Sequence, residues 1–166
     1  MKGRENMKTK VLSLLVDNQS GVLSRVSGMF SRRGYNIDSL SVGVTQDPKF
    51  SRMTVAVSGD DKILTQIKNQ LNKLEDVVEI IELEDGASVC RELVLIKVKA
   101  DLDQRQEIIS MANVFRANIV DVSPDSLMIE ITGNNGKIKA FINLLDGFEI
   151  EELVRTGLTG LTRGID

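Results

Sequence analysis

Few residues in this sequence could carry catalytic chemistry. The chain has no histidine and no tryptophan, and its only cysteine is Cys90. Without histidine there is no Ser-His-Asp or Cys-His pair, and no imidazole acid or base near neutral pH. One cysteine cannot form a CxxC pair, an intrachain disulfide or a cysteine-based zinc site. Lysines, carboxylates and a single tyrosine remain, so we expect a chain that is not an enzyme by itself.

The strongest candidate for ligand binding is a polar turn that ends in a glycine. It reads Asp17-Asn18-Gln19-Ser20-Gly21 and lies between an apolar strand and a helical pattern. Glycine allows close approach of the backbone, and the free N–H groups of Gly21, Val22 and Leu23 at a helix start suit a small carboxylate or phosphate. The Asn18 amide could hold an ammonium or an amide. The alternative is an ordinary helix cap, made by Asn18 or Ser20.

Other polar features give weaker signals. The segment 133–137 resembles the end of a P-loop but lacks its full spacing, and Ile138 stands where serine or threonine would hold magnesium. The acidic pairs at 60–61 and at 101 and 103 could bind a divalent cation, although acids at helix starts usually complement the helix dipole. Arg32-Arg33 is more typical of a solvated or partner-facing spot than of a nucleic-acid patch. We therefore expect no metal site.

Composition narrows the partners and the compartment. The net charge is −3 and the pI is about 5.1, so no global field favours nucleic acid or an anionic membrane. No apolar run approaches the roughly 20 residues that cross a bilayer, and residues 1–10 lack the apolar region of a signal peptide. One unpaired cysteine fits a reducing compartment. We expect a cytoplasmic protein with no membrane contact.

An internal repeat defines the elements that position the glycine turn. Residues 52–62 resemble residues 126–137, since each is an alternating apolar strand followed by glycine, a polar pair and a helical pattern. The upstream parts also correspond, with a strand, a helix and a second strand in each half. Each half closes on one more apolar strand. This order, β-α-β-β-α-β over roughly 75 residues, predicts an α+β protein with two ferredoxin-like domains and antiparallel sheets.

The domain boundary is predicted in the short polar stretch 84–88, which gives domains at 7–84 and 89–166. In the first, Leu23, Val26 and Phe30 are expected on the buried face of a helix that ends at Gly34. Units this small bury little surface alone, so sheet edges and open sheet faces are expected to pair with the other domain or another subunit.

The two copies differ most at the turn after their first strand. The second copy reads Lys99-Ala100-Asp101-Leu102-Asp103-Gln104-Arg105 and has neither the glycine nor the serine. If capping were the whole purpose, both halves should use similar chemistry, so the asymmetry favours a ligand site in the first copy. RNA recognition by this topology needs aromatic residues on the central strands, and the segments 52–58 and 126–132 contain none. Metallochaperones of this topology need a CxxC, which is absent.

At several motifs the sequence resembles the small regulatory subunit of acetolactate synthase (acetohydroxyacid synthase), a family of ACT-domain proteins. The resemblance runs from about Met7 to the C-terminus and leaves out the Met1–Asn6 extension. Its motifs are NQSGVLSRV at 18–26, FSRRGYNI at 30–37, SL at 39–40, SRMT at 51–54, QIKNQLNKL at 66–74, RE at 91–92, FR at 115–116, IVDV at 119–122 and RTGLTGLTRG at 155–164.

The resemblance implies a chain without catalytic activity that associates with a large catalytic subunit. That subunit, which is expected to carry thiamine diphosphate, Mg and FAD, condenses pyruvate with pyruvate or 2-oxobutyrate in valine, leucine and isoleucine biosynthesis. The small subunit stimulates it and confers feedback inhibition, commonly by valine. ACT domains would pair edge to edge in a homodimer and bind the effector between them. The effector-binding residues carried over are Asn18, Gly21, Val22, Leu23 and Ser24, with Asn36 and Ile37 from the neighbouring subunit.

Two alternatives remain open. The chain could be a free-standing amino-acid-binding ACT module that regulates a different partner, in which case it would not stimulate an acetolactate synthase catalytic subunit. It could also be a carboxylate-based metal enzyme, which a metal assay on the purified protein would detect.

Overall fold

The computed structural model describes residues 7–164 and separates into two compact units. The first unit contains the chain up to Val89 together with the segment from Leu158, and the second runs from Cys90 to Gly157. Each unit has the order βαββαβ with an antiparallel sheet, so the predicted α+β class with two ferredoxin-like domains is confirmed. The Met1–Asn6 extension lies outside the described residues.

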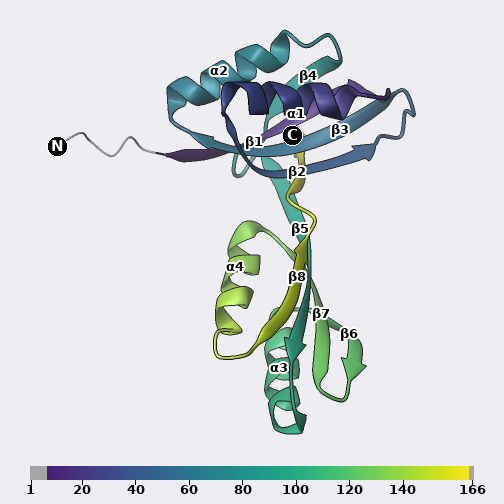
Figure 1. The fold of residues 1–166 in the computed structure, drawn as a ribbon, viewed down its shortest axis with the longest axis vertical. Coiled ribbons are helices and arrows are strands. Elements are labelled where there is room, and N and C mark those ends of the chain that lie inside the picture. The colour runs from purple at the N-terminus through teal and green to yellow at the C-terminus, as the bar shows by residue number, and fades with distance from the viewer. Residues whose placement is uncertain (1–6, 165–166) are drawn as a thin grey trace, which may run out of the picture. The chain divides into compact units, whose positions relative to one another are not determined.

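The first unit has two helices on one face of a four-stranded sheet (Figure 1). The sheet has the strand order β2-β3-β1-β4, and β1 and β2 are both antiparallel to β3. Alternating side chains of the strands pack against the helices because successive strand residues point to opposite faces. The elements are β1 (Lys8–Asp17), α1 (Val22–Arg33), β2 (Asn36–Val44), β3 (Phe50–Gly59), α2 (Asp61–Asn72) and β4 (Val77–Glu82).

The second unit repeats this arrangement with the strand order β6-β7-β5-β8. Its core again places one phenylalanine, Phe141, among aliphatic side chains between the sheet and the helices, with isoleucine and alanine more frequent than in the first core. The elements are β5 (Ser88–Lys99), α3 (Leu102–Val114), β6 (Asn118–Ser123), β7 (Ser126–Gly133), α4 (Asn135–Leu144) and β8 (Ile150–Arg155).

The end of the chain forms a short strand, β9 (Thr159–Thr162), that pairs with β5 and groups with the first unit. The Leu158 carbonyl accepts a hydrogen bond from Ser41 Oγ at 3.0 Å, and the Leu158 N–H donates to Ser39 Oγ at 3.4 Å. Both serines lie on the open face of the first sheet, the face away from α1 and α2. The sequence placed this segment in the domain 89–166 and predicted no strand in it, because its apolar residues do not alternate.

Helix α1 matches the prediction at its end but not on its whole buried face. Gly34 follows it in the left-handed conformation, with φ 66°, and its N–H bonds the last carbonyls as expected of a glycine C-cap. Val26 and Phe30 are buried, as predicted. Leu23 is 49% exposed, so its predicted place on the buried face is wrong. Val22 packs into the core in its stead, because the helix begins one residue before Leu23.

Candidate functional site

The first turn of α1 has no side-chain cap. Gly21 occupies the N-cap position in the left-handed conformation, with φ 87° and ψ −6°. This conformation costs an ordinary L-residue about 1–2 kcal/mol, whereas glycine adopts it freely. The alternative interpretation, a helix cap made by Asn18 or Ser20, is therefore wrong. Of the N–H groups predicted to be free, that of Val22 donates to the Gln19 carbonyl at 3.4 Å. The N–H groups of Leu23 and Ser24 in the first turn have no side-chain cap, as an anion site at a helix start requires.

The other three helices of residues 7–164 are all capped by a side chain. Asp60 accepts from the Ile63 N–H at the start of α2, and Asn134 accepts from the Lys137 N–H at the start of α4. Asp101 caps α3 in a reciprocal capping box with Gln104. The open helix start is thus specific to α1, and the sequence difference between the two copies of the turn corresponds to a structural difference.

Asn18 is engaged within the chain. Its side-chain Nδ2 donates to the Pro48 carbonyl at 2.9 Å, and its Oδ1 accepts from Ser51 Oγ at 3.2 Å. These bonds fasten the β2–β3 hairpin to the end of β1, so Asn18 shapes the turn. The Oδ1 atom keeps one lone pair for a ligand ammonium, since an amide oxygen accepts two hydrogen bonds.

Arg25 is a charged residue of this turn that sequence reasoning did not include in the site. Its Nε donates to Asp76 Oδ2 at 2.5 Å, and this hydrogen bond raises the pKa of Arg25 above its ordinary value. A Cβ added at Gly21 would lie 3.0 Å from Arg25 Nη1, so the guanidinium lies beside the glycine. Asp76 balances the charge of this guanidinium, so what Arg25 can add to the turn is the N–H donors of Nη1 rather than net positive charge. The partner Asp76 is 51 residues away in sequence, and no local pattern signals the pair.

The structure places Asn36 and Ile37 far from the glycine turn within one chain. Along β3, the end of β1 at Asp17 pairs with Phe50, whereas Asn36 at the start of β2 pairs with Ser58. These positions are eight residues apart on β3, which is about 26 Å at ~3.3 Å per residue. A single chain therefore brings Asn18, Gly21, Val22, Leu23 and Ser24 together but not Asn36 and Ile37.

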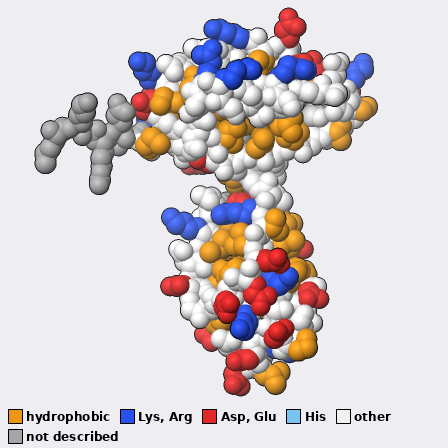
Figure 2. All heavy atoms as spheres, in the orientation of Figure 1, with side chains coloured by type: hydrophobic (Ala, Val, Ile, Leu, Met, Phe, Trp, Pro, Cys, Tyr) orange, Lys and Arg blue, Asp and Glu red, His pale blue; other side chains and the backbone are white. Residues whose placement is uncertain are grey.

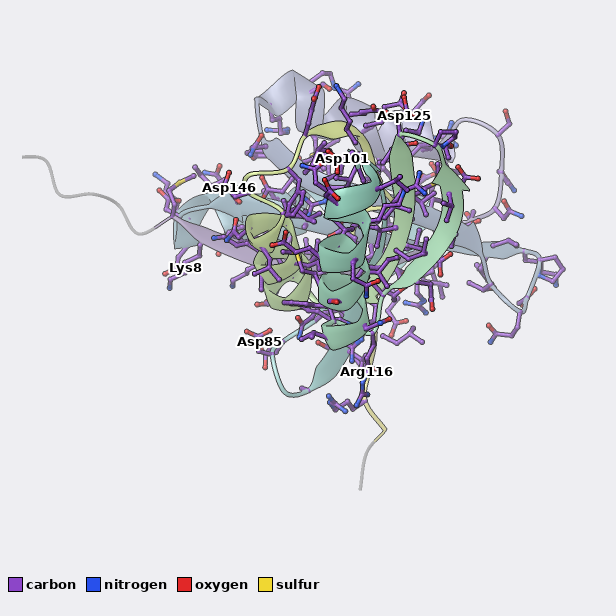
Figure 3. The ribbon with its side chains drawn as sticks, turned by 90° about the horizontal axis from the view of Figure 1, so that it is seen from below. Lys8, Asp85, Asp101, Arg116, Asp125 and Asp146 are labelled. Atoms are coloured by element: carbon purple, nitrogen blue, oxygen red, sulfur yellow. The ribbon has the colours of Figure 1, made fainter. Side chains whose placement is uncertain are left out.

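The corresponding turn of the second unit has the opposite electrostatic character. A cavity of about 670 Å³ lies there, lined by Asp101, Asp103, Asp125 and Glu149 with Lys99 as the lining cation. Figure 3 shows Asp101 at one end of α3 and Arg116 at the other. Acidic side chains also outnumber basic ones by eleven to eight between Cys90 and Gly157, and red side chains are prominent on this second unit in Figure 2. An acidic, capped helix start disfavours a carboxylate ligand.

Two further observations concern the described part of the chain. Residues 7–164 contain no group of three or more acidic or cysteine side chains arranged to hold a metal ion. They also contain no helix that is both long and apolar enough to span a bilayer.

Comparison with known proteins agrees with this geometry. A family model described as an AHAS small subunit-like ACT domain matches residues 12–79, and one described as the small subunit of acetolactate synthase matches residues 91–164. The first unit, with its βαββαβ fold and open glycine turn, is therefore an ACT domain. The chain as a whole belongs to the acetolactate synthase small subunit family.

Named relatives extend over nearly the whole chain. The acetolactate synthase small subunit of Mycobacterium bovis is 52% identical over 157 residues, which cover 95% of this chain and 94% of that protein. The small subunit of acetolactate synthase isozyme 3 from Escherichia coli is 46% identical over 156 residues, covering 93% and 96%. The crystal structure of the small subunit from Thermotoga maritima superposes with a TM-score of 0.87 at 41% identity, covering 96% of this chain and 99% of that one.

Proposed function

We propose that this regulatory subunit stimulates an acetolactate synthase catalytic subunit and makes it sensitive to a branched-chain amino acid, with valine the first candidate. The effector would bind at the interface between two ACT domains, and the thiamine-diphosphate chemistry would reside in the catalytic subunit. The observation that carries the proposal is the open first turn of α1 at Gly21, beside the Arg25 guanidinium, in a chain of this family.

The turn offers a complementary group for each part of an amino acid. The N–H groups of Leu23 and Ser24 would bind the carboxylate, with Arg25 Nη1 as a further N–H donor. The free lone pair of Asn18 Oδ1 would accept from the ammonium. The Leu23 side chain is exposed rather than part of the core. It would pack against the branched aliphatic side chain of the effector. None of these groups has to change protonation near neutral pH, which suits a sensor without histidine.

A second copy of the chain supplies the missing half of this site. Strand β2 lies at the edge of the sheet, and its last valines, Val42 and Val44, are 48% and 63% exposed. A two-fold dimer that pairs β2 with β2 runs the two strands antiparallel. The start of the partner's β2 then lies at the end of this chain's β2, which is the end of the sheet where Gly21 is found. Asn36 and Ile37 of the second copy thereby approach the glycine turn.

A ligand between two copies can bias the geometry of the dimer and so change the activity of a bound catalytic subunit. A coupling free energy of about 1–3 kcal/mol corresponds to inhibition of about 5- to 150-fold. If the effector changes the affinity of the chain for the catalytic subunit, linkage requires that the catalytic subunit changes the affinity of the chain for the effector by the same factor.

The direct experiment mixes the full-length chain with its cognate catalytic subunit and measures acetolactate formation with and without valine. We expect stimulation by the chain and inhibition by valine, with leucine and isoleucine as matched comparisons. If the chain does not stimulate the catalytic subunit, the result would favour the alternative, an amino-acid-binding module that regulates another partner. Stimulation without any amino-acid response would refute the effector site while leaving the subunit assignment in place.

A further inference from the structure

A second cavity lies on the open face of the first sheet, away from α1. Its volume is about 370 Å³, and it lies between the second half of β2, the adjacent part of β3 and the chain end. Two motifs with no place in the effector site, SRMT at 51–54 and the C-terminal RTGLTGLTRG, contribute to its lining. Its lining includes Ser41, Gly43, Arg52, Thr54 and Gly160.

The hollow exists because a glycine faces an arginine across two strands. Gly43 pairs with Arg52 in the β2–β3 register, and Ser41 pairs with Thr54. A Cβ added at Gly43 would meet no atom within 4 Å, so any larger side chain would project into free space above the sheet. The chain end forms the opposite wall, where Gly160 is buried and the Leu158 carbonyl accepts a hydrogen bond from Ser41 Oγ.

Thr54 is a buried polar residue with no partner. Its side chain is only 2% exposed and lines the cavity, and its hydroxyl makes no hydrogen bond to any group in residues 7–164. Among the described residues the buried side-chain polar atom without a partner is Arg105 Nε, so the Thr54 hydroxyl oxygen still reaches the open space of the cavity. The Thr54 hydroxyl is therefore available to a molecule that enters the cavity.

Arg52 places an unpaired positive charge in the same hollow. Its Nη1 donates to Ser13 Oγ at 2.8 Å, and Ser13 is itself 1% exposed, so this bond fixes the guanidinium on the sheet. No carboxylate among the described residues forms an ion pair with Arg52, and its other N–H groups make no hydrogen bond there. A half-buried guanidinium with a fixed orientation and free donors matches the planar geometry of a carboxylate.

We propose that this cavity binds a small carboxylate that also carries a hydroxyl group, such as a 2-hydroxy acid. Arg52 binds the carboxylate, and the Thr54 hydroxyl forms a hydrogen bond with the hydroxyl oxygen of the ligand. The two side chains are alternate residues on one strand face, about 6–7 Å apart along the strand. The volume lies at the lower end of the range for small-molecule sites, so a small 2-hydroxy acid fits inside it. The site is separate from the effector turn and does not depend on the proposed feedback inhibition.

The test titrates the full-length protein with L-lactate as the probe and follows binding by NMR and calorimetry. We expect saturable binding that shifts the Gly43 amide and the Arg52 Nε–H resonances. Acetate, which lacks the hydroxyl group of lactate, should bind more weakly. Gly43→Val, which fills the hollow, and Arg52→Gln, which removes the charge, should each weaken lactate binding at least tenfold.

Two variants separate this site from a structural role and from the effector site. Thr54→Val keeps the volume and removes only the hydroxyl, so it should weaken lactate binding towards that of acetate without lowering the melting temperature. Gly21→Asp should leave lactate binding unchanged. The proposal is overturned if lactate shows no saturable binding at millimolar concentrations, if Gly43→Val binds it as the wild type does, or if Gly21→Asp is the variant that loses it.

Discussion

Replacing Gly21 by aspartate or alanine separates the two roles of this residue, the left-handed helix start and the open anion site. Alanine tests the backbone, because φ 87° is unfavourable for a residue with a Cβ and that atom would lie 3.0 Å from Arg25 Nη1. Aspartate tests the site as well. Its carboxylate would lie beside the unbonded N–H groups of the first turn, where the effector carboxylate is expected.

The two substitutions should rank in opposite orders for stability and for binding. Gly21→Ala should lower the free energy of unfolding by about 1–2 kcal/mol, the cost of the left-handed conformation. Gly21→Asp should cost less, because aspartate tolerates this conformation better and can bond the free N–H groups. Valine affinity should fall further in Gly21→Asp, by about 10- to 150-fold, since a charged hydrogen bond contributes about 1.5–3 kcal/mol.

The assays are urea unfolding for stability and titration calorimetry with valine for affinity. Gly86 supplies a matched control, because it has φ 81° and a Cβ there would meet nothing within 4 Å. Gly86→Ala should show a similar loss of stability with unchanged valine affinity. The reasoning is refuted if Gly21→Asp binds valine like the wild type, or if the affinities of all three variants simply follow their stabilities.

Three further predictions concern other parts of the first unit. Asp60→Ala removes the cap of α2 and should lower the free energy of unfolding by about 1 kcal/mol in urea denaturation; an unchanged midpoint would contradict the capping role. Burial raises the pKa of Glu82, but hydrogen bonds from Lys10 and Lys68 outweigh it, so the pKa lies below its ordinary value. The stabilisation is therefore present above the ordinary carboxyl pKa and is lost as pH falls through the lowered pKa. At pH 7 the free energy of unfolding of the wild type should exceed that of Glu82→Gln by about 1 kcal/mol or less. Urea unfolding across pH should show this difference disappearing in acid. Val42→Lys charges the free edge of β2 and should weaken the proposed dimer at least tenfold in sedimentation equilibrium, while a dimer of unchanged affinity would exclude β2 as the interface.

Much of the fold follows from local patterns in the sequence. The alternating strands, the helical periodicity and the repeat predict βαββαβ twice, because these patterns record which face of each element is buried. Gly34 is likewise predictable as a helix end, since only its conformational freedom is needed there. Leu23 was wrongly placed because its spacing fits the apolar face, whereas the actual first helical residue, Val22, takes the buried position.

The candidate site divides in the same way. The glycine turn is visible in the sequence because all its residues are consecutive and its counterpart in the second copy lacks the glycine. The ion pair of Arg25 with Asp76 is not visible, because it joins residues 51 positions apart through the packing of α1 near the start of β4. The strand β9 at the end of the chain is likewise not visible in the sequence. It depends on pairing with β5, and the adjacent Leu158 depends on hydrogen bonds with hydroxyl groups of β2, rather than on the strand propensity of the segment.

By itself, therefore, the sequence determines the class of the fold, the lack of histidine- and cysteine-based chemistry and the position of the open helix start. Those properties depend on residue type, periodicity and backbone freedom, which are local. Only the tertiary structure decides that Asn36 and Gly21 lie at opposite ends of the sheet, and that the chain end closes a cavity over Arg52 and Thr54. Strand direction and register set these distances, and both arise from contacts between residues far apart in the chain.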